Sequence, residues 1–236
     1  MFNPRPRIES IPITPRHACH VIDDALLEPE RWVDFAAAHV AEFVESGHNA
    51  YPGPELRMDD AVSAQLDLFF STHLRSLLGA RRTERMYSRM SIATRAPESL
   101  HPRQRIPHID RLDATPGQCL AASVLYLFKD ETLGGTNFYM PRRPQAEILK
   151  LMADASTLPT AAFERETGIG PAYMRGSNAW FQEVLSVPAR FNRLIVYDGG
   201  VFHSGDIATP EKLSPDPREG RLTFNGFFIC RRALSA

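Results

Sequence analysis

Apolar positions in the first third of the chain recur with helical spacing. Within residues 28–46 they follow one another at intervals of up to four, which predicts an amphipathic helix. These positions are Trp32, Phe35, Ala36, Val40 and Phe43. A second helix is predicted over residues 59–79, with Gly79 as its C-terminal cap. Residues 1–22 should be extended, because prolines at positions 4, 6, 12 and 15 exclude a helix there.

The rest of the chain is dominated by patterns typical of strands. Alternating or β-branched apolar runs occupy residues 85–95, 121–128, 134–140, 190–198 and 220–230. The pattern between Pro141 and Pro188 becomes helical again, in "QAEILKLMADAS" and in "SNAWFQEVLS". We therefore predict a helical insertion within a β architecture.

Many short strands preceded by helices favour a mainly β fold with flanking helices, a β-sandwich or jelly roll with helices on one face. A generic α+β domain is the alternative. We expect residues 1–236 to form one domain. Its expected parts are helical support over 1–80, a jelly-roll core over 84–140 and 188–232, and a helical insertion over 141–187.

Composition and charge narrow the classes of protein. The 236 residues are 43% hydrophobic and 23% charged, as in an ordinary globular protein, and the net charge of -1 gives no electrostatic reason to expect nucleic acid or a membrane as partner. Three widely spaced cysteines argue against a disulfide framework. The N-terminus has no apolar stretch of a secretory signal, so we expect a cytoplasmic protein.

A histidine and a carboxylate stand two positions apart in "RIPHIDRLD", residues 105–113. Residues i and i+2 of an extended chain share a face, so His108 and Asp110 would converge on one point. Alone, the pair would favour a hydrogen-bonded contact at a strand edge over a metal site. His203, after the turn in "VYDGGVFHSGD", offers a second imidazole. Two histidines and one carboxylate form the facial triad that holds Fe(II) and leaves positions open for substrate and oxygen.

One arginine in the last predicted strand has the features of an acid-binding group. In "GRLTFNG", alternation places Arg221, Thr223 and Asn225 on one face and the apolar residues between them on the other. A buried guanidinium needs a partner, which is either a protein carboxylate such as Asp198 or Asp206, or a bound acid. The guanidinium fork with a hydroxyl two residues away suits a bound carboxylate.

Four motifs occur in the order "PHID", "LGGTNF", "YDGGVFHSGD" and "RLT". Together they resemble the motifs of the Fe(II)- and 2-oxoglutarate-dependent dioxygenases over residues 104–229. The order is most similar to the prolyl-hydroxylase-like branch, and to an uncharacterised bacterial family within it. The prolyl hydroxylases themselves grip the oxoacid with a lysine, whereas this sequence offers Arg221, so a proline substrate does not follow from the resemblance.

The resemblance implies a double-stranded β-helix, which is a jelly roll. It implies Fe(II) on His108, Asp110 and His203, with 2-oxoglutarate bound through its far carboxylate to Arg221 and Thr223. With O2 the oxoacid would be decarboxylated to succinate and a C–H bond of the substrate oxidised, most simply by hydroxylation. The phenol of Tyr126 is a further candidate donor to the oxoacid, although a tyrosine filling the core fits that position equally well.

The substrate is left open, as either a small molecule or a peptidyl side chain. Aromatic and methionine residues of the insertion are expected either to form a lid or wall of the pocket or to fill the insertion's own core. These are Tyr173, Met174, Trp180 and Phe181. Two other functions remain: a non-catalytic jelly-roll sensor that binds metal or oxoacid, and a cupin-like metalloenzyme that does not use 2-oxoglutarate. The sequence does not indicate an oligomeric state.

Overall fold

The computed structural model describes residues 2–45, 51–110, 115 and 117–232, so the end of the "RIPHIDRLD" stretch lies outside it. The helices and strands in chain order are β1 (Ile8–Thr14), β2 (His17–Ile22), α1 (Pro29–Ala38), β3 (Glu55–Arg57), α2 (Asp60–His73), β4 (Ala80–Ala93), β5 (Gln118–Tyr126), β6 (Thr136–Pro141), α3 (Gln145–Thr157), α4 (Thr160–Thr167), β7 (Phe181–Val187), β8 (Leu194–Asp198), β9 (Phe202–Gly205) and β10 (Arg221–Arg232). Short 3-10 turns join several of them.

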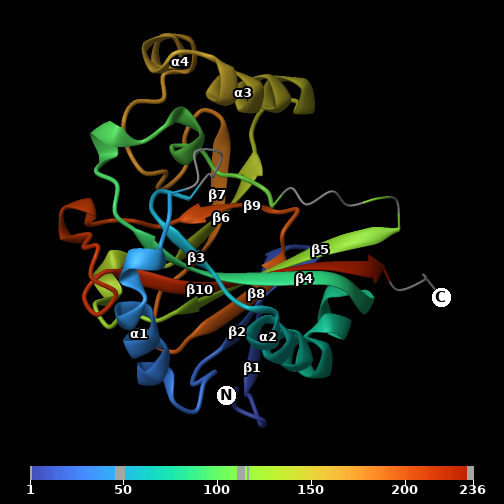
Figure 1. Ribbon diagram of the computed structural model, residues 1–236. Helices are drawn as coiled ribbons and strands as arrows, with labels where there is room; N and C mark the ends of the chain where they lie inside the picture. Colours follow the sequence, from blue (N-terminus) through green and yellow to red (C-terminus); the bar gives the residue numbers. More distant parts are fainter. Residues whose placement is uncertain (1, 46–50, 111–114, 116, 233–236) are drawn as a thin grey trace.

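Two antiparallel sheets form the body of the molecule (Figure 1). The large sheet has the strand order β1-β2-β8-β5-β10-β4-β3, and the small sheet has the order β7-β6-β9. The small sheet is extended by a bridge between His108 and His203 on β9. The four strands β8-β5-β10-β4 thus face a layer of β7, β6, β9 and the segment at His108. The fold is therefore mainly β, a double-stranded β-helix with N-terminal helices and a helical insertion, as the sequence predicts.

Strand alternation divides the apolar residues between two faces of the large sheet. On β10, Leu222, Phe224 and Phe228 are buried on the face that α1 and α2 cover. Trp32 of α1 stacks on Phe224 at a centroid distance of 5.3 Å. Phe70 of α2 stacks on Phe228 at 4.0 Å. The two N-terminal helices therefore support the back of the sheet and leave its other face for the space between the sheets.

Both N-terminal helices are present where the sequence predicts them, and both are shorter than predicted. Helix α2 begins after Asp59, whose carboxylate accepts from the backbone N–H of Val62 at 2.7 Å. It ends at His73, and the predicted cap Gly79, where φ is +64°, instead ends the 3-10 turn that follows. The predicted helix over residues 28–46 is shorter than expected: α1 ends at Ala38, and a 3-10 turn follows it.

One of the two helical stretches predicted in the insertion contains a strand instead. Residues 145–156 are helical as expected, but the stretch "SNAWFQEVLS" forms a turn and then β7, which pairs with β6. The side chain of Asn178 accepts from the backbone N–H groups of Trp180 and Phe181, which fixes the turn. A short apolar run does not distinguish helix from strand by its period, and here pairing with a distant strand decides.

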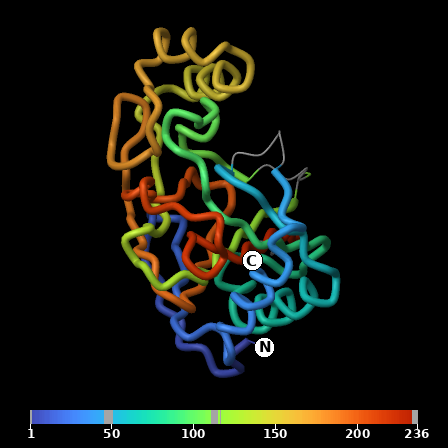
Figure 2. The backbone as a smooth tube through the Cα atoms, turned by 60° about the vertical axis from the view of Figure 1, so that its left-hand side comes forward, coloured from blue at the N-terminus to red at the C-terminus, as the bar shows by residue number. Residues whose placement is uncertain are grey.

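Helices α3 and α4 lie at one end of the elongated molecule, opposite the N-terminal segment (Figure 2). They enclose a separate apolar cluster that includes Phe163 and Phe181, both fully buried. Trp180 packs against this cluster. Among the described residues, no helix combines the length and the apolar character needed to cross a membrane.

Candidate metal centre

Three side chains with metal-ligating groups converge at the edge of the small sheet. His108 pairs with His203 through two backbone hydrogen bonds of 3.0 and 2.9 Å, and the N–H of Asp110 donates to the carbonyl of Gly199 at 2.8 Å. This pairing aims His108 and Asp110 toward His203. One ligand atom from each of the three lies within 4.8 Å of the others. The predicted convergence of the His-x-Asp pair with the distant histidine is thus present in the fold.

The protonation of the cluster suits metal coordination. The Nδ1 of His203 lies 2.9 Å from the carbonyl of Val201, which can only accept, so Nδ1 carries the hydrogen and Nε2 presents its lone pair to the centre. Burial lowers the pKa of His108 well below 6.5, and the neighbouring His203 lowers it further, so the ring is neutral. Burial raises the pKa of Asp110, while His203 and Arg89 oppose this rise.

The donor set fits a divalent cation such as Fe(II). The Oδ2 of Asp110 is buried without a hydrogen-bond partner among the described residues and lies 3.7 Å from Nε2 of His203. A buried carboxylate oxygen left without a donor is costly, and a bound cation would compensate it. About a third of the His108 side chain remains accessible, on the side that faces a cavity. Two imidazoles and one carboxylate leave other coordination positions to ligands from that cavity.

Arg221 lies in the same cavity and is 4% exposed. Its Nε–H is shared between the carbonyls of Leu133 and Gly134 at 3.1 Å each, and Nη2 donates to the carbonyl of Gly135 at 2.8 Å. These carbonyls orient the guanidinium, but they do not neutralise its charge. Within the part of the chain that the structure describes, no carboxylate forms an ion pair with Arg221.

The two protein carboxylates that the sequence offered as partners of Arg221 bind other residues. Asp198 lies 3.6 Å from Nε2 of His17. Asp206 accepts from Nε of Arg175 at 2.8 Å. The structural alternative for Arg221, an ion pair with either aspartate, is therefore not realised.

Polar side chains continue from Arg221 along the wall of the cavity. The alternation predicted for β10 is confirmed: Thr223 and Asn225 lie on the cavity face, where Nδ2 of Asn225 donates to Oγ1 of Thr223 at 3.1 Å. The phenol of Tyr51 lies beside Arg221 and Thr223; burial raises its pKa and Arg221 opposes the rise. Tyr51 was not a candidate in the sequence, because it precedes β3 and reaches the site only through the fold.

Tyr126 lies one layer behind the cavity. Its side chain is fully buried, and its phenol is 2.8 Å from Oγ1 of Thr136. Thr136 lines the cavity, whereas Tyr126 does not. Thr136 is thus the hydroxyl that borders the space, and a hydrogen bond from Tyr126 to an oxoacid stays a prediction.

The cavity has a volume of about 730 Å³ and reaches from the candidate metal centre to the insertion. Both predictions for the aromatic and methionine residues of the insertion apply. Tyr173 and Met174 line the cavity. Trp180 and Phe181 belong to the insertion's own core, to which Met174 also contributes.

Gly134 and Gly135, just before β6, contribute two of the carbonyls that orient Arg221. We expect Gly135→Ala to be destabilising, because this position has no room for a side chain. An alanine Cβ at Gly135 would lie 1.9 Å from the carbonyl oxygen of Val187. Relieving that overlap must move the backbone, at a cost of about 1–3 kcal/mol or more. The matched control is Gly170→Ala, where a Cβ meets nothing within 4 Å, and which should change the free energy of unfolding little. Urea denaturation measures both, and equal stabilities would contradict the tight approach.

Comparisons with solved structures identify 2-oxoglutarate-dependent enzymes. SnoN, a non-heme α-ketoglutarate-dependent epimerase from nogalamycin biosynthesis, is 15% identical over 94% of this chain and 83% of SnoN, with a TM-score of 0.48. HygX from Streptomyces hygroscopicus, solved with nickel and 2-oxoglutarate, is 12% identical over 89% and 82%, with a TM-score of 0.49. An N-substituted L-amino acid dioxygenase from Burkholderia ambifaria is 14% identical over 89% and 81%, with a TM-score of 0.39.

These identities and TM-scores are low, so they carry no conclusion about what this chain binds or converts. No curated protein matches the chain significantly. A family model, in contrast, spans nearly its whole length, matching residues 4–228. The chain therefore belongs to DUF6445, a family of unknown function.

Proposed function

We propose that this protein is an Fe(II)- and 2-oxoglutarate-dependent oxygenase, most simply a hydroxylase. The observation that carries the proposal is the combination found in one cavity. His108, Asp110 and His203 converge there, and Arg221 is buried beside them with no carboxylate partner among the described residues. A metal triad and an uncompensated guanidinium together suit a co-substrate that has a metal-chelating end and a distant carboxylate.

Each residue has a distinct role in this proposal. His108 presents a neutral imidazole, His203 directs Nε2 to the centre, and Asp110 supplies the one anionic ligand. Arg221 and Thr223 bind the far carboxylate of 2-oxoglutarate, and the carbonyls of residues 133–135 keep the guanidinium aimed into the cavity. When bound, iron with 2-oxoglutarate supplies the oxidation of a substrate C–H bond by O2.

Several finer assignments belong to the same proposal. Kinship with the prolyl-hydroxylase-like branch rests on the four motifs and their order. The substrate is a small molecule or a peptidyl side chain, and neither nucleic acid nor a membrane is an expected partner, because the net charge is only -1. We expect the protein to act in the cytoplasm, where thiols such as the buried Cys19, Cys119 and Cys230 stay reduced.

The first test is spectroscopic and needs no substrate. Metal-free protein is given Fe(II) and then 2-oxoglutarate without oxygen, and the visible charge-transfer band of an oxoacid chelated to iron is recorded. We expect the band to appear. The Asp110→Ala protein is the comparison, because it removes the only anionic ligand while leaving Arg221 in place.

The outcome separates the candidate functions. A band in the wild-type protein, followed by succinate formation with O2, supports the oxygenase. Iron binding without a charge-transfer band would refute the use of 2-oxoglutarate and favour a cupin-like metalloenzyme. If the band forms but no candidate substrate leads to succinate, the non-catalytic sensor is favoured.

A further inference from the structure

A second arginine, Arg89 on β4, faces the cavity from the strand beside Arg221. It pairs in register with Asn225 of β10, so its side chain is on the cavity face of the sheet. Its Nη1 donates to Oε2 of Glu55 at 2.9 Å, and its Nε lies 2.9 Å from Oε1 of Glu55. The guanidinium also stacks on the ring of Phe227, with 4.6 Å between Cζ and the ring centroid. The ion pair with Glu55 and the stacking on Phe227 therefore hold the guanidinium of Arg89 in one orientation.

The remaining edge of Arg89 is available to a ligand. Nη2 donates no hydrogen bond within the described part of the chain, and 23% of the side chain is accessible, against 9% for Glu55. Glu55 does not line the cavity, so the pair presents its cationic side to the space and keeps its anionic side behind. An arginine oriented in this way binds a carboxylate with little loss of side-chain entropy.

The charged groups of the cavity wall are mostly cationic. The wall contains Arg89, Arg103 and Arg221, whereas Asp110 is its only carboxylate among the described residues. Asp110 belongs to the metal centre and Arg221 to the co-substrate. The wall therefore favours an anionic group on the substrate as well.

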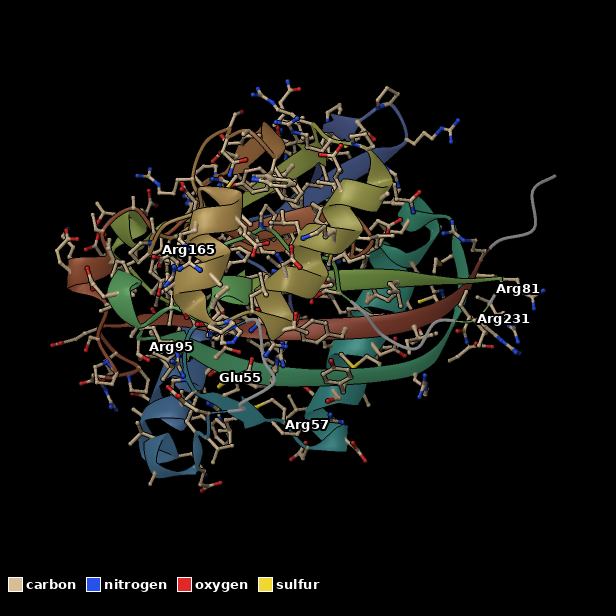
Figure 3. All side chains as sticks on the ribbon, turned by 90° about the horizontal axis from the view of Figure 1, so that it is seen from above. Glu55, Arg57, Arg81, Arg95, Arg165 and Arg231 are labelled. Carbon is tan, nitrogen blue, oxygen red and sulfur yellow. The ribbon has the colours of Figure 1, made fainter. Side chains whose placement is uncertain are left out.

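Apolar surfaces border the same space. Tyr87 and Phe227 line it from β4 and β10, with their rings stacked at 4.9 Å. From the insertion, Leu149, Met152 and Ala153 of α3 line it too, at positions that share one face of a helix. Leu149 is 49% exposed although it is apolar. Figures 1 and 3 both place α3 above the strands, so the apolar face of α3 is positioned to cover what lies on them.

We propose that the substrate is an organic acid with an apolar body. Its carboxylate binds to Arg89, and its body lies between the Tyr87–Phe227 surface and the apolar face of α3. This assignment rests on the proposed function for the identity of the reaction, but the acid pocket can be tested without turnover. It places the carboxylate in the cavity that the candidate metal centre also lines.

The test compares acids with their neutral analogues. The probes are 3-phenylpropionate and hexanoate, with 3-phenylpropionamide and hexanamide as matched compounds that lack the charge. Binding to the protein loaded with Fe(II) and 2-oxoglutarate is measured by calorimetry without oxygen, and repeated on the metal-free protein. We expect at least one acid to bind about tenfold or more tightly than its amide.

The variants separate the guanidinium from the ion pair that holds it. Arg89→Gln removes the cation that faces the buried carboxylate of Glu55, so Glu55→Gln/Arg89→Gln is the second variant, in which both charges are removed together. Both should lose the preference for acid over amide. Glu55→Gln alone keeps the guanidinium and should bind the acid at least as tightly as the wild type. Arg85→Gln, at an exposed position on the same strand, should change nothing.

Loss of the acid preference in the double variant, with its retention in Glu55→Gln, supports the assignment. It is overturned if no acid binds better than its amide, or if the double variant keeps the preference. It is also overturned if the double variant weakens the 2-oxoglutarate band, because Arg89 would then grip the co-substrate. An acid preference that depends on Arg89 in a protein that forms no band would refute the oxygenase and leave the acid pocket standing.

Basic residues elsewhere do not offer a comparable site. Arg81 and Arg231 lie together at the far end of the long strands, away from Glu55 (Figure 3). Arg231 is paired with Glu84 there, and both arginines are on the outside of the molecule. At Arg89, in contrast, an oriented guanidinium and apolar walls border one cavity.

Discussion

Replacing His203 with alanine should abolish both stable Fe(II) binding and oxidation driven by 2-oxoglutarate. The side chain is 5% exposed, and it is the ligand supplied by β9, opposite the two from the His108 segment. Removing an outer-shell partner of a metal ligand typically costs about 10- to 100-fold in affinity, and removing the ligand itself should cost more. Metal content after gel filtration and succinate formation are the measurements.

The fold should survive this change, which keeps the two effects apart. The strand β9 is held by its backbone pairing with β6, and the imidazole contributes one hydrogen bond to the carbonyl of Val201. The melting temperature should fall by only a few degrees. His39→Ala, at the end of α1 and outside the lining of the cavity, is the matched control. If His203→Ala kept its full iron content, His203 would not be a ligand of the metal.

The residues of the candidate metal centre could be predicted because two simple regularities meet there. Residues i and i+2 of an extended segment share a face, and this rule alone aligned His108 with Asp110. The alternation of β10 likewise placed Arg221 and Thr223 on the inner face. Neither rule gave the distance to His203, which depends on the bridge between the His108 segment and β9. The motifs of a known family supplied that step.

The parts of the site that escaped prediction depend on pairings between distant segments. Tyr51 and Glu55 come from the short stretch around β3, which joins the edge of the large sheet beside β4. Arg89 has the same alternation as many exposed arginines, and only its pairing with Asn225 places it in the cavity. Local pattern carries no information about such neighbours.

One specific expectation failed for a local reason. The run that begins at Phe181 has too few residues for its period to identify a strand, and its pairing with β6 decides. For Tyr126 the sequence left two roles open, a donor to the oxoacid and a tyrosine that fills the core. The side chain is fully buried, and its phenol lies beside Thr136, which lines the cavity.

Replacing Arg221 should weaken the binding of 2-oxoglutarate and leave the binding of Fe(II) unchanged. Arg221→Gln removes a charge-assisted contact worth about 1.5–3 kcal/mol, which corresponds to an increase of roughly 10- to 150-fold in the 2-oxoglutarate concentration required. Arg221→Lys keeps the charge but loses the fork and should fall between wild type and Arg221→Gln. Titration of the charge-transfer band with 2-oxoglutarate gives the requirement, and Fe(II) binding is measured on the same samples.

Arg221 also donates to three backbone carbonyls, so replacing it should lower the stability of the protein as well. This effect must be distinguished from the weaker binding of 2-oxoglutarate. Carbonyls of residues 133–135 that lose their donor are buried at a cost of about 1–3 kcal/mol, and both variants should unfold at lower urea concentrations. Gly135→Ala disturbs the same carbonyls while leaving the guanidinium in place. If it raised the 2-oxoglutarate requirement as much as Arg221→Gln, or if Arg221→Gln left that requirement unchanged, Arg221 would be a structural clamp on the turn before β6. A large effect confined to the arginine variants would instead identify a carboxylate-binding group, because only they remove the cation that faces the co-substrate.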